Sequence, residues 1–131
     1  MLVFCVQTDR KQVRTTIAQL AEAIAANDVN KVLTFVDEDA YDTMEKAKSH
    51  MGTATIEWAK VRDFRVVNIN YFTPEPLAIV SFRGSVGGKA KGLDVPFTVV
   101  VQFTEVELIK NADGKWRVTD NCRFSYPGYR N

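Results

Sequence analysis

The chain has 131 residues, of which 46% are hydrophobic and 25% are charged, the balance of an ordinary globular domain rather than of a disordered segment. Lysine and arginine number 17 and aspartate and glutamate 16, so no net field favours a nucleic acid or an anionic membrane. We therefore expect one domain over residues 1–131 and no nucleic-acid partner.

Residues 1–7 contain a short apolar run, Leu2 to Val6, which is too short for a membrane span or for the core of a signal peptide. We expect an apolar N-terminal arm, or the tail of a longer hydrophobic segment upstream. The chain as written is expected in the cytoplasm, with an upstream anchor or signal as the alternative. Cys5 and Cys122 have no metal-ligand spacing and are expected to pack as small apolar side chains. With a single histidine besides, the sequence predicts no metal and no cofactor.

The first half of the chain has helical periodicity. Apolar residues recur at three- and four-residue spacing from Val13 to Ile24. Asp9 with Gln12 is an acceptable capping pair at the start of this helix. The helix is expected to end near Asn27, whose side chain suits a turn.

Further helical segments are expected before the second half of the chain. Residues 29–36 continue as a shorter helix, which makes a helical hairpin with the first one. Residues 41–51 suit a third helix, which Gly52 interrupts. Residues 55–62 are interpreted as one or two additional helical turns.

The second half changes to the alternating pattern of β-strands. The expected strands, joined as a meander, cover residues 65–72, 77–86, 95–109 and 115–126. The glycine-rich stretch from Gly84 to Gly92 is interpreted as a flexible hairpin loop, and residues 111–114 as a tight turn.

The third predicted strand changes phase near Thr104. Apolar residues occupy odd positions up to Phe103, whereas Val106 and Leu108 occupy even ones. A β-bulge that bends the strand explains this shift. The alternative is a strand buried on both faces, as in a dimer interface.

The order of these elements, closed by the turn-and-strand sequence from Asp113 to Val118, resembles the nuclear transport factor 2-like superfamily. That superfamily includes ketosteroid isomerase, scytalone dehydratase and SnoaL-type polyketide cyclases. The resemblance implies an α+β fold, with N-terminal helices packed on a strongly curved, mainly antiparallel sheet of about four to five strands. It also implies a cone-like shape with a cavity, and often a homodimer made through the outer face of the sheet.

Three residues are candidates for acid/base chemistry in such a cavity. Asp120 shares its parity with Trp116 and Val118, which directs its carboxyl group to an apolar interior suited to a general base or acid. Alternatively, the strand bulges near Asp120 and leaves the carboxylate hydrated or hydrogen-bonded. His50 is a candidate partner of Asp120 or a solvated helix residue. Tyr71 is a candidate oxyanion donor or a core aromatic residue.

Four aromatic residues are candidates for binding a ligand or, alternatively, for filling the core: Trp58, Phe64, Phe82 and Tyr41. Because apolar groups outnumber committed catalytic groups, the sequence favours non-catalytic binding of a small apolar ligand or a protein partner. The alternatives are a small-molecule isomerase, dehydratase or cyclase with a lipophilic substrate, and a dimerisation module.

Overall fold

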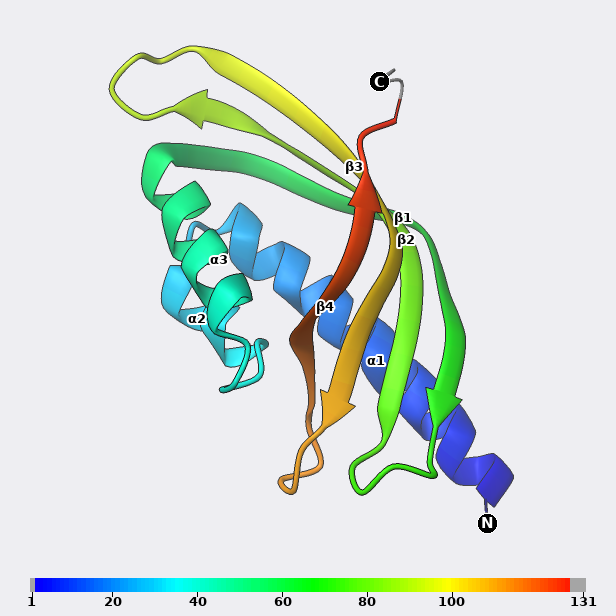
Figure 1. Cartoon of the computed structure of the whole chain (residues 1–131). Coiled ribbons are helices and arrows are strands. Elements are labelled where there is room, and N and C mark those ends of the chain that lie inside the picture. The colour runs from blue at the N-terminus through cyan, green and yellow to red at the C-terminus, as the bar shows by residue number, and fades with distance from the viewer. Residues whose placement is uncertain (1, 128–131) are drawn as a thin grey trace.

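The computed structural model describes the backbone of residues 2–127 and the side chains of residues 7–127. Three helices precede a four-stranded antiparallel sheet (Figure 1). The helices are α1 (Leu2–Ala25), α2 (Val29–Thr34) and α3 (Tyr41–Thr53). The strands are β1 (Ala54–Asn70), β2 (Leu77–Ala90), β3 (Pro96–Lys110) and β4 (Trp116–Ser125). They follow one another in space in chain order, so the predicted α+β meander is confirmed, with β1 and β4 at its edges.

α1 begins earlier than the sequence predicted. The backbone of residues 2–7 forms the first turns of the helix rather than a separate arm, while the Cys5 side chain lies outside the described residues. Asp9 is therefore an internal helix residue that is only 3% exposed. The expected capping pair of Asp9 with Gln12 is wrong, because distant residues bind the Asp9 carboxylate.

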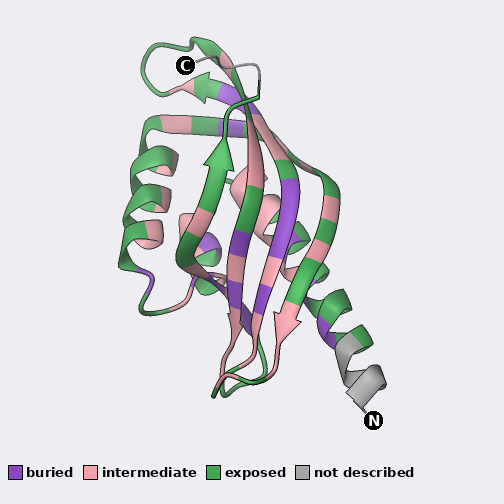
Figure 2. Cartoon of the chain, turned by 45° about the vertical axis from the view of Figure 1, so that its right-hand side comes forward, coloured by how far each residue is buried: buried purple, intermediate pink, exposed green. Residues whose placement is uncertain are grey.

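The core lies where α1 crosses the concave face of the sheet. Val13 and Ile17 of α1 pack against apolar side chains of β2, β3 and β4. Figure 2 shows the buried residues concentrated on β2 and on the parts of β3 and β4 nearest to their connecting turn. Full burial of each such aliphatic side chain contributes roughly 1.5–3 kcal/mol. The strand members of this core are Ala78, Val80, Phe82, Val106, Leu108, Trp116 and Val118.

β1 includes residues 55–62, which the sequence analysis assigned to helical turns. Shifts of register interrupt its pairing with β2, and one of them lies between Ile56 and Trp58. Each shift breaks the alternation of inward and outward side chains, which hides the period of a strand. The helical assignment is therefore wrong.

The glycines expected in a flexible loop belong mostly to β2, which extends to Ala90. The indole of Trp58 lies directly on Gly87, and the backbone of Thr55 and Ile56 approaches Gly88. A Cβ atom at either glycine would collide with these groups. Close approach between strands, rather than flexibility, explains these two glycines.

The phase change near Thr104 is a β-bulge, which confirms the first of the two explanations that the sequence analysis gave. The register of β2 with β3 shifts between the pairs Val80 with Val106 and Phe82 with Phe103. Bulges increase twist and bend the strand that carries them. The resulting curvature gives the sheet the concave face into which α1 packs.

Hydrogen bonds from the helix connections fix the helices to both edges of the sheet. The side chain of Asn27, after α1, bonds the backbone N–H and carbonyl of Ile56 in β1 at 2.7 and 2.8 Å. After α2, Asp37 N–H donates to the Val118 carbonyl, and Val118 N–H donates to the Phe35 carbonyl, each at 2.8 Å. The helical hairpin is thereby held at β1 and at β4.

One cross-strand pair on the outer face of the sheet places two positive charges opposite each other. Arg62 and Arg83 are exposed and directly opposite each other, and no carboxylate among the described side chains pairs with either. Replacing Arg62→Glu should raise the free energy of unfolding by about 0.5 kcal/mol, because it converts repulsion into attraction. Urea denaturation measures this change. Arg62→Gln should give a smaller gain, and a loss of stability in Arg62→Glu would contradict the prediction.

Candidate functional site

Asp120 does not point into an apolar interior, which corrects the first of the two readings of this residue. Thr119, Asp120 and Asn121 of β4 lie opposite the single residue Glu107 of β3, so β4 bulges here. The Asp120 carboxylate is exposed and accepts bonds from the Thr43 hydroxyl at 2.7 Å and the Thr43 N–H at 2.8 Å. It therefore caps the first turn of α3 and attaches that helix to β4.

The hydrogen bonds from Thr43, first from its hydroxyl and then from its backbone, lower the pKa of Asp120 below its ordinary value. A carboxyl group whose pKa is lower in the folded state stabilises the fold above its unfolded pKa. That stabilisation is lost as the pH falls through the folded pKa. The contribution of Asp120 is accordingly present at neutral pH and disappears in acid.

We predict that Asp120→Asn lowers the urea midpoint at neutral pH, and that the difference from wild type shrinks progressively as the pH falls below about 4. Urea denaturation over a pH series measures this dependence. Asp39→Asn is the matched control, because Asp39 is exposed and precedes α3 without bonding it through its side chain. A difference that grows towards acid pH would contradict the assignment.

His50 and Tyr41 lie on α3 and are exposed, Tyr41 to 70%. Within the described residues no hydrogen bond or ion pair joins His50 to Asp120. The backbone carbonyl of His50 accepts a hydrogen bond from the Thr53 hydroxyl at 3.1 Å. The structure therefore does not bring the predicted acid/base pair together.

Tyr71 belongs to a polar cluster that the sequence analysis missed. Its hydroxyl donates to one oxygen of Asp9 at 2.7 Å, and the Lys110 ammonium binds the other at 2.9 Å. Asp9 comes from α1, whereas Tyr71 follows β1 and Lys110 ends β3. The residues are up to 101 positions apart, so only the tertiary fold reveals the cluster.

The Asp9 cluster stabilises the attachment of α1 to the sheet. Asp9→Asn should lower the free energy of unfolding by about 2 kcal/mol. This is below the roughly 3–5 kcal/mol of a fully buried pair, because the Lys110 side chain keeps 30% exposure. Chemical denaturation measures the loss. The control is Asp42→Asn, which breaks an exposed pair with Lys46 and should change stability by less than about 0.5 kcal/mol.

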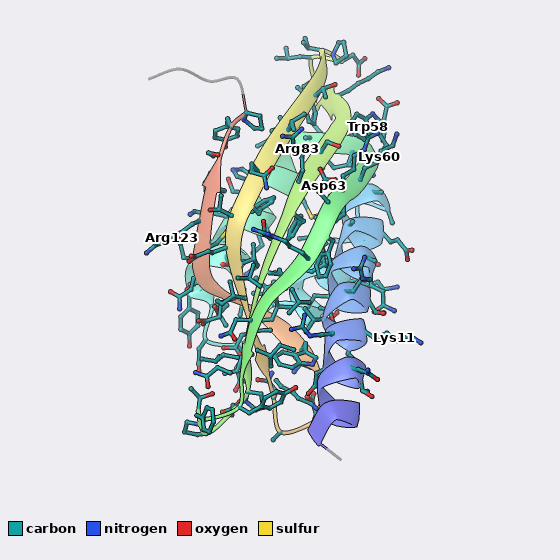
Figure 3. The ribbon with its side chains drawn as sticks, turned by 90° about the vertical axis from the view of Figure 1, so that its right-hand side faces the viewer. Lys11, Trp58, Lys60, Asp63, Arg83 and Arg123 are labelled. Carbon is teal, nitrogen blue, oxygen red and sulfur yellow. The ribbon has the colours of Figure 1, made fainter. Side chains whose placement is uncertain are left out.

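Trp58 lies on the outer face of the sheet, away from α1, and not in the predicted cavity. It pairs with Gly87 of β2. Side chains alternate between the two faces along β2, so with Phe82 facing inward the odd-numbered position 87 faces outward. Trp58 is 36% exposed, and the Lys60 ammonium lies 5.5 Å from the centroid of its ring. Figure 3 shows Trp58 and Lys60 together with Arg83 at one end of the sheet.

Phe64 and Phe82 lie on the concave face, where they begin a row of aromatic rings that crosses all four strands. Successive ring centroids are 6.3, 4.8 and 6.1 Å apart from Phe64 through Phe82 and Phe103 to Phe124. Phe82 belongs to the core, whereas Phe124 on the edge strand is 48% exposed. The row therefore leads from the core to an accessible apolar surface.

The half of the concave face beyond α1 carries apolar side chains that remain accessible. The register with β2 places the odd-numbered residues of β3 from Phe97 to Phe103 on this face, and Phe103 pairs with Phe124. Val99 is 36% exposed. We call this surface the open concave face and define it by Phe97, Val99, Val101, Phe103 and Phe124.

α3 covers the sheet loosely. It contains no fully buried residue, and Met44, Ala47 and Met51 along one side are only partly buried. Its first turn is held by Asp120 of β4, and its last residue leads directly into β1, so α3 connects the two edges of the sheet. Methionine side chains adapt readily to apolar ligands of different shape.

Cys122 points to the apolar side of β4 and contacts the core. Burial raises the pKa of its thiol above the ordinary value, although the positive charge of Lys46 on α3 acts in the opposite direction. The thiol is therefore neutral at physiological pH and fits the expected packing role better than a nucleophilic one.

Two open hollows lie beside α1. The larger, about 560 Å³, separates α1 from the beginning of β4 and includes the buried Trp116, whose indole N–H has no partner among the described residues. The smaller, about 380 Å³, lies between α1 and β1. The described side chains form no group of three or more His, Cys, Asp or Glu residues suited to a metal ion. No helix among the described residues combines the length and apolarity needed to cross a membrane.

Comparison with solved structures supports the fold. A ketosteroid isomerase-like protein from Erwinia carotovora atroseptica SCRI1043 superposes with a TM-score of 0.63 at 16% identity, covering 92% of this chain and 98% of that one. No model of a protein family matches the chain, and no curated protein matches its sequence. At such low identity the likeness concerns the fold and not the activity. The chain shares the curved α+β fold of this ketosteroid isomerase-like protein, and its element order predicted that kind of fold.

Proposed function

We propose that this domain binds a small apolar molecule on the open concave face without transforming it. The observation that carries the proposal is the accessibility of apolar side chains inside the curve of the sheet, led by Phe124 at 48% and Val99 at 36% exposure. Apolar surface of this kind gains free energy when a ligand removes it from water. We expect the partly buried methionines of α3, which connects the two edges of the sheet, to supply an adaptable second wall.

The polar groups support binding rather than catalysis. Asp120 bonds the backbone of α3, and Tyr71 bonds Asp9. A general base must reach its substrate within hydrogen-bond distance, and these groups are held in structural contacts instead. The expected homodimer through the outer face stays a prediction. A cationic pair, Arg62 with Arg83, lies on that face and does not favour contact between two identical copies there.

Neighbouring valines of β3 provide a matched test. Val99 and Val100 are 36% and 37% exposed, and successive residues of a strand point to opposite faces. Val99→Glu should weaken binding of the uncharged dye N-phenyl-1-naphthylamine at least about tenfold, because it places a carboxylate on the apolar face. Val100→Glu should change the affinity less than about twofold.

Dye fluorescence and its displacement by uncharged lipophilic compounds measure the affinity. Thermal unfolding of both variants checks that the fold is retained. Equal weakening by the two substitutions, or no saturable binding by the wild-type protein, would refute the proposal. Binding of an apolar peptide in place of every small molecule would instead identify a protein partner.

A further inference from the structure

We infer that the smaller hollow, between α1 and β1, is a binding site for a ligand that carries a phosphate group. This site is distinct from the open concave face and independent of the function proposed above. Four of its six lining residues are cationic and none is acidic: Arg10, Lys11, Arg14, Phe64, Arg65 and Val66. Its volume of about 380 Å³ lies within the usual range of small-molecule sites, about 300–1,000 Å³.

The cations of this hollow are not neutralised by the protein. None of the four takes part in an ion pair with a described side chain. Asp9 precedes Arg10 in the sequence, but its carboxylate is buried and bound by Tyr71 and Lys110. Asp63 precedes Phe64 and, within the described residues, forms no ion pair with these cations. Gathering like charges without a counter-charge is unfavourable, and an anionic ligand would remove that repulsion.

Two of the arginines are oriented by contacts that leave most of their donors available. The Arg14 guanidinium carbon lies 4.8 Å from the centroid of the Phe64 ring. A cation–π contact occupies none of the guanidinium's N–H donors in a hydrogen bond to an acceptor oxygen, and no described residue accepts one from Arg14. Arg10 donates through Nη1 to the Val66 carbonyl at 3.4 Å, a long hydrogen bond that uses one of five N–H donors.

The bulge of β1 places the remaining groups. Its register shifts between Arg62 and Arg65, and Asp63 adopts a positive φ of 55°. This irregularity directs Phe64 toward the aromatic row of the concave face. Arg65 pairs with Ser81, which alternates with the inward-facing Val80 and Phe82, so Arg65 lines the hollow from the outer side of the edge strand. Figure 3 shows α1 and β1 side by side. Local backbone strain of this kind is often found where a strand forms part of a binding site.

The chemistry favours a phosphate ester. Guanidinium groups bind phosphate oxygens through paired, charge-assisted hydrogen bonds, and several arginines together suit a doubly charged group. A nucleic acid fits less well, because the chain as a whole carries 16 acidic against 17 basic side chains. A long polyanion would experience that nearly balanced field, whereas a single phosphate interacts mainly with charges within about 8 Å. The phosphate can belong to a soluble ester or to a lipid headgroup.

Calorimetric titration with inorganic pyrophosphate tests the site directly. Arg14→Gln combined with Arg65→Gln should weaken binding about tenfold or more, because it removes two of the four cations. The matched control, Lys31→Gln with Lys89→Gln, removes the same charge from two exposed lysines outside the hollow and should change the affinity less than about twofold. Thermal unfolding verifies that each variant is folded.

A second pair of variants covers the case in which the glutamine variant does not fold. Arg14→Lys with Arg65→Lys keeps the charge and removes the paired donors, so intermediate affinity is expected. Flotation with phosphatidylcholine vesicles, with and without phosphatidic acid, distinguishes a lipid headgroup from a soluble ester. Binding to either phosphate source supports the site. The proposal would be overturned if Lys31→Gln with Lys89→Gln weakened binding as much as the arginine-to-glutamine variant does. The absence of saturable binding to both pyrophosphate and phosphatidic acid would also overturn it.

Discussion

The curvature of the sheet is the constraint on which the rest of this structure depends. Bulges bend the long strands, and α1 is straight, so one helix cannot cover the whole concave face (Figure 1). Val13 and Ile17 fill the half that contains Val80 and Leu108 and produce the core there. The other half keeps accessible apolar side chains. The core and the candidate site are thus two parts of the same concave face: α1 covers the first and does not reach the second.

The carboxylates of this protein illustrate why a polar residue near an apolar surface does not define an active site. Asp9 is almost fully buried, yet a tyrosine hydroxyl and a lysine bind both of its oxygens. Asp120 holds α3, and Glu107 accepts bonds from Thr119 and Asn121 across the same bulge. Each group stabilises a junction between elements. The cost of burying Asp9 is offset by its bonds to Tyr71 and Lys110.

The sequence predicted the class of fold because the periodicity of its main elements survives in the structure. It failed where tertiary contacts change the local rule. Parity along β4 correctly grouped Trp116, Val118 and Cys122, but two additional residues in the bulge displaced Asp120 without changing the parity of Cys122. The start of α1 was misplaced because Asp9 has the composition of a cap and the contacts of a core residue.

The sequence predicted the candidate surfaces only in part, because these surfaces too depend on tertiary contacts. Phe64 and Phe82 were identified as aromatic candidates, whereas Val99 and Phe124 matter through their exposure, which no pattern of residue types reports. Trp58 was assigned to the cavity because β1 was not yet visible as a strand. The hollow of arginines combines helix and strand residues more than 50 positions apart, as the bond from Arg10 to Val66 shows.

Phe64 connects the two proposed sites. The Arg14 guanidinium lies 4.8 Å from the centroid of the Phe64 ring. The ring of Phe82 is its aromatic neighbour, with 6.3 Å between the two centroids. From Phe82 the row continues through Phe103 to the open concave face. The bulge of β1 therefore places Phe64 in contact both with an arginine of the proposed phosphate site and with the apolar residues of the concave face.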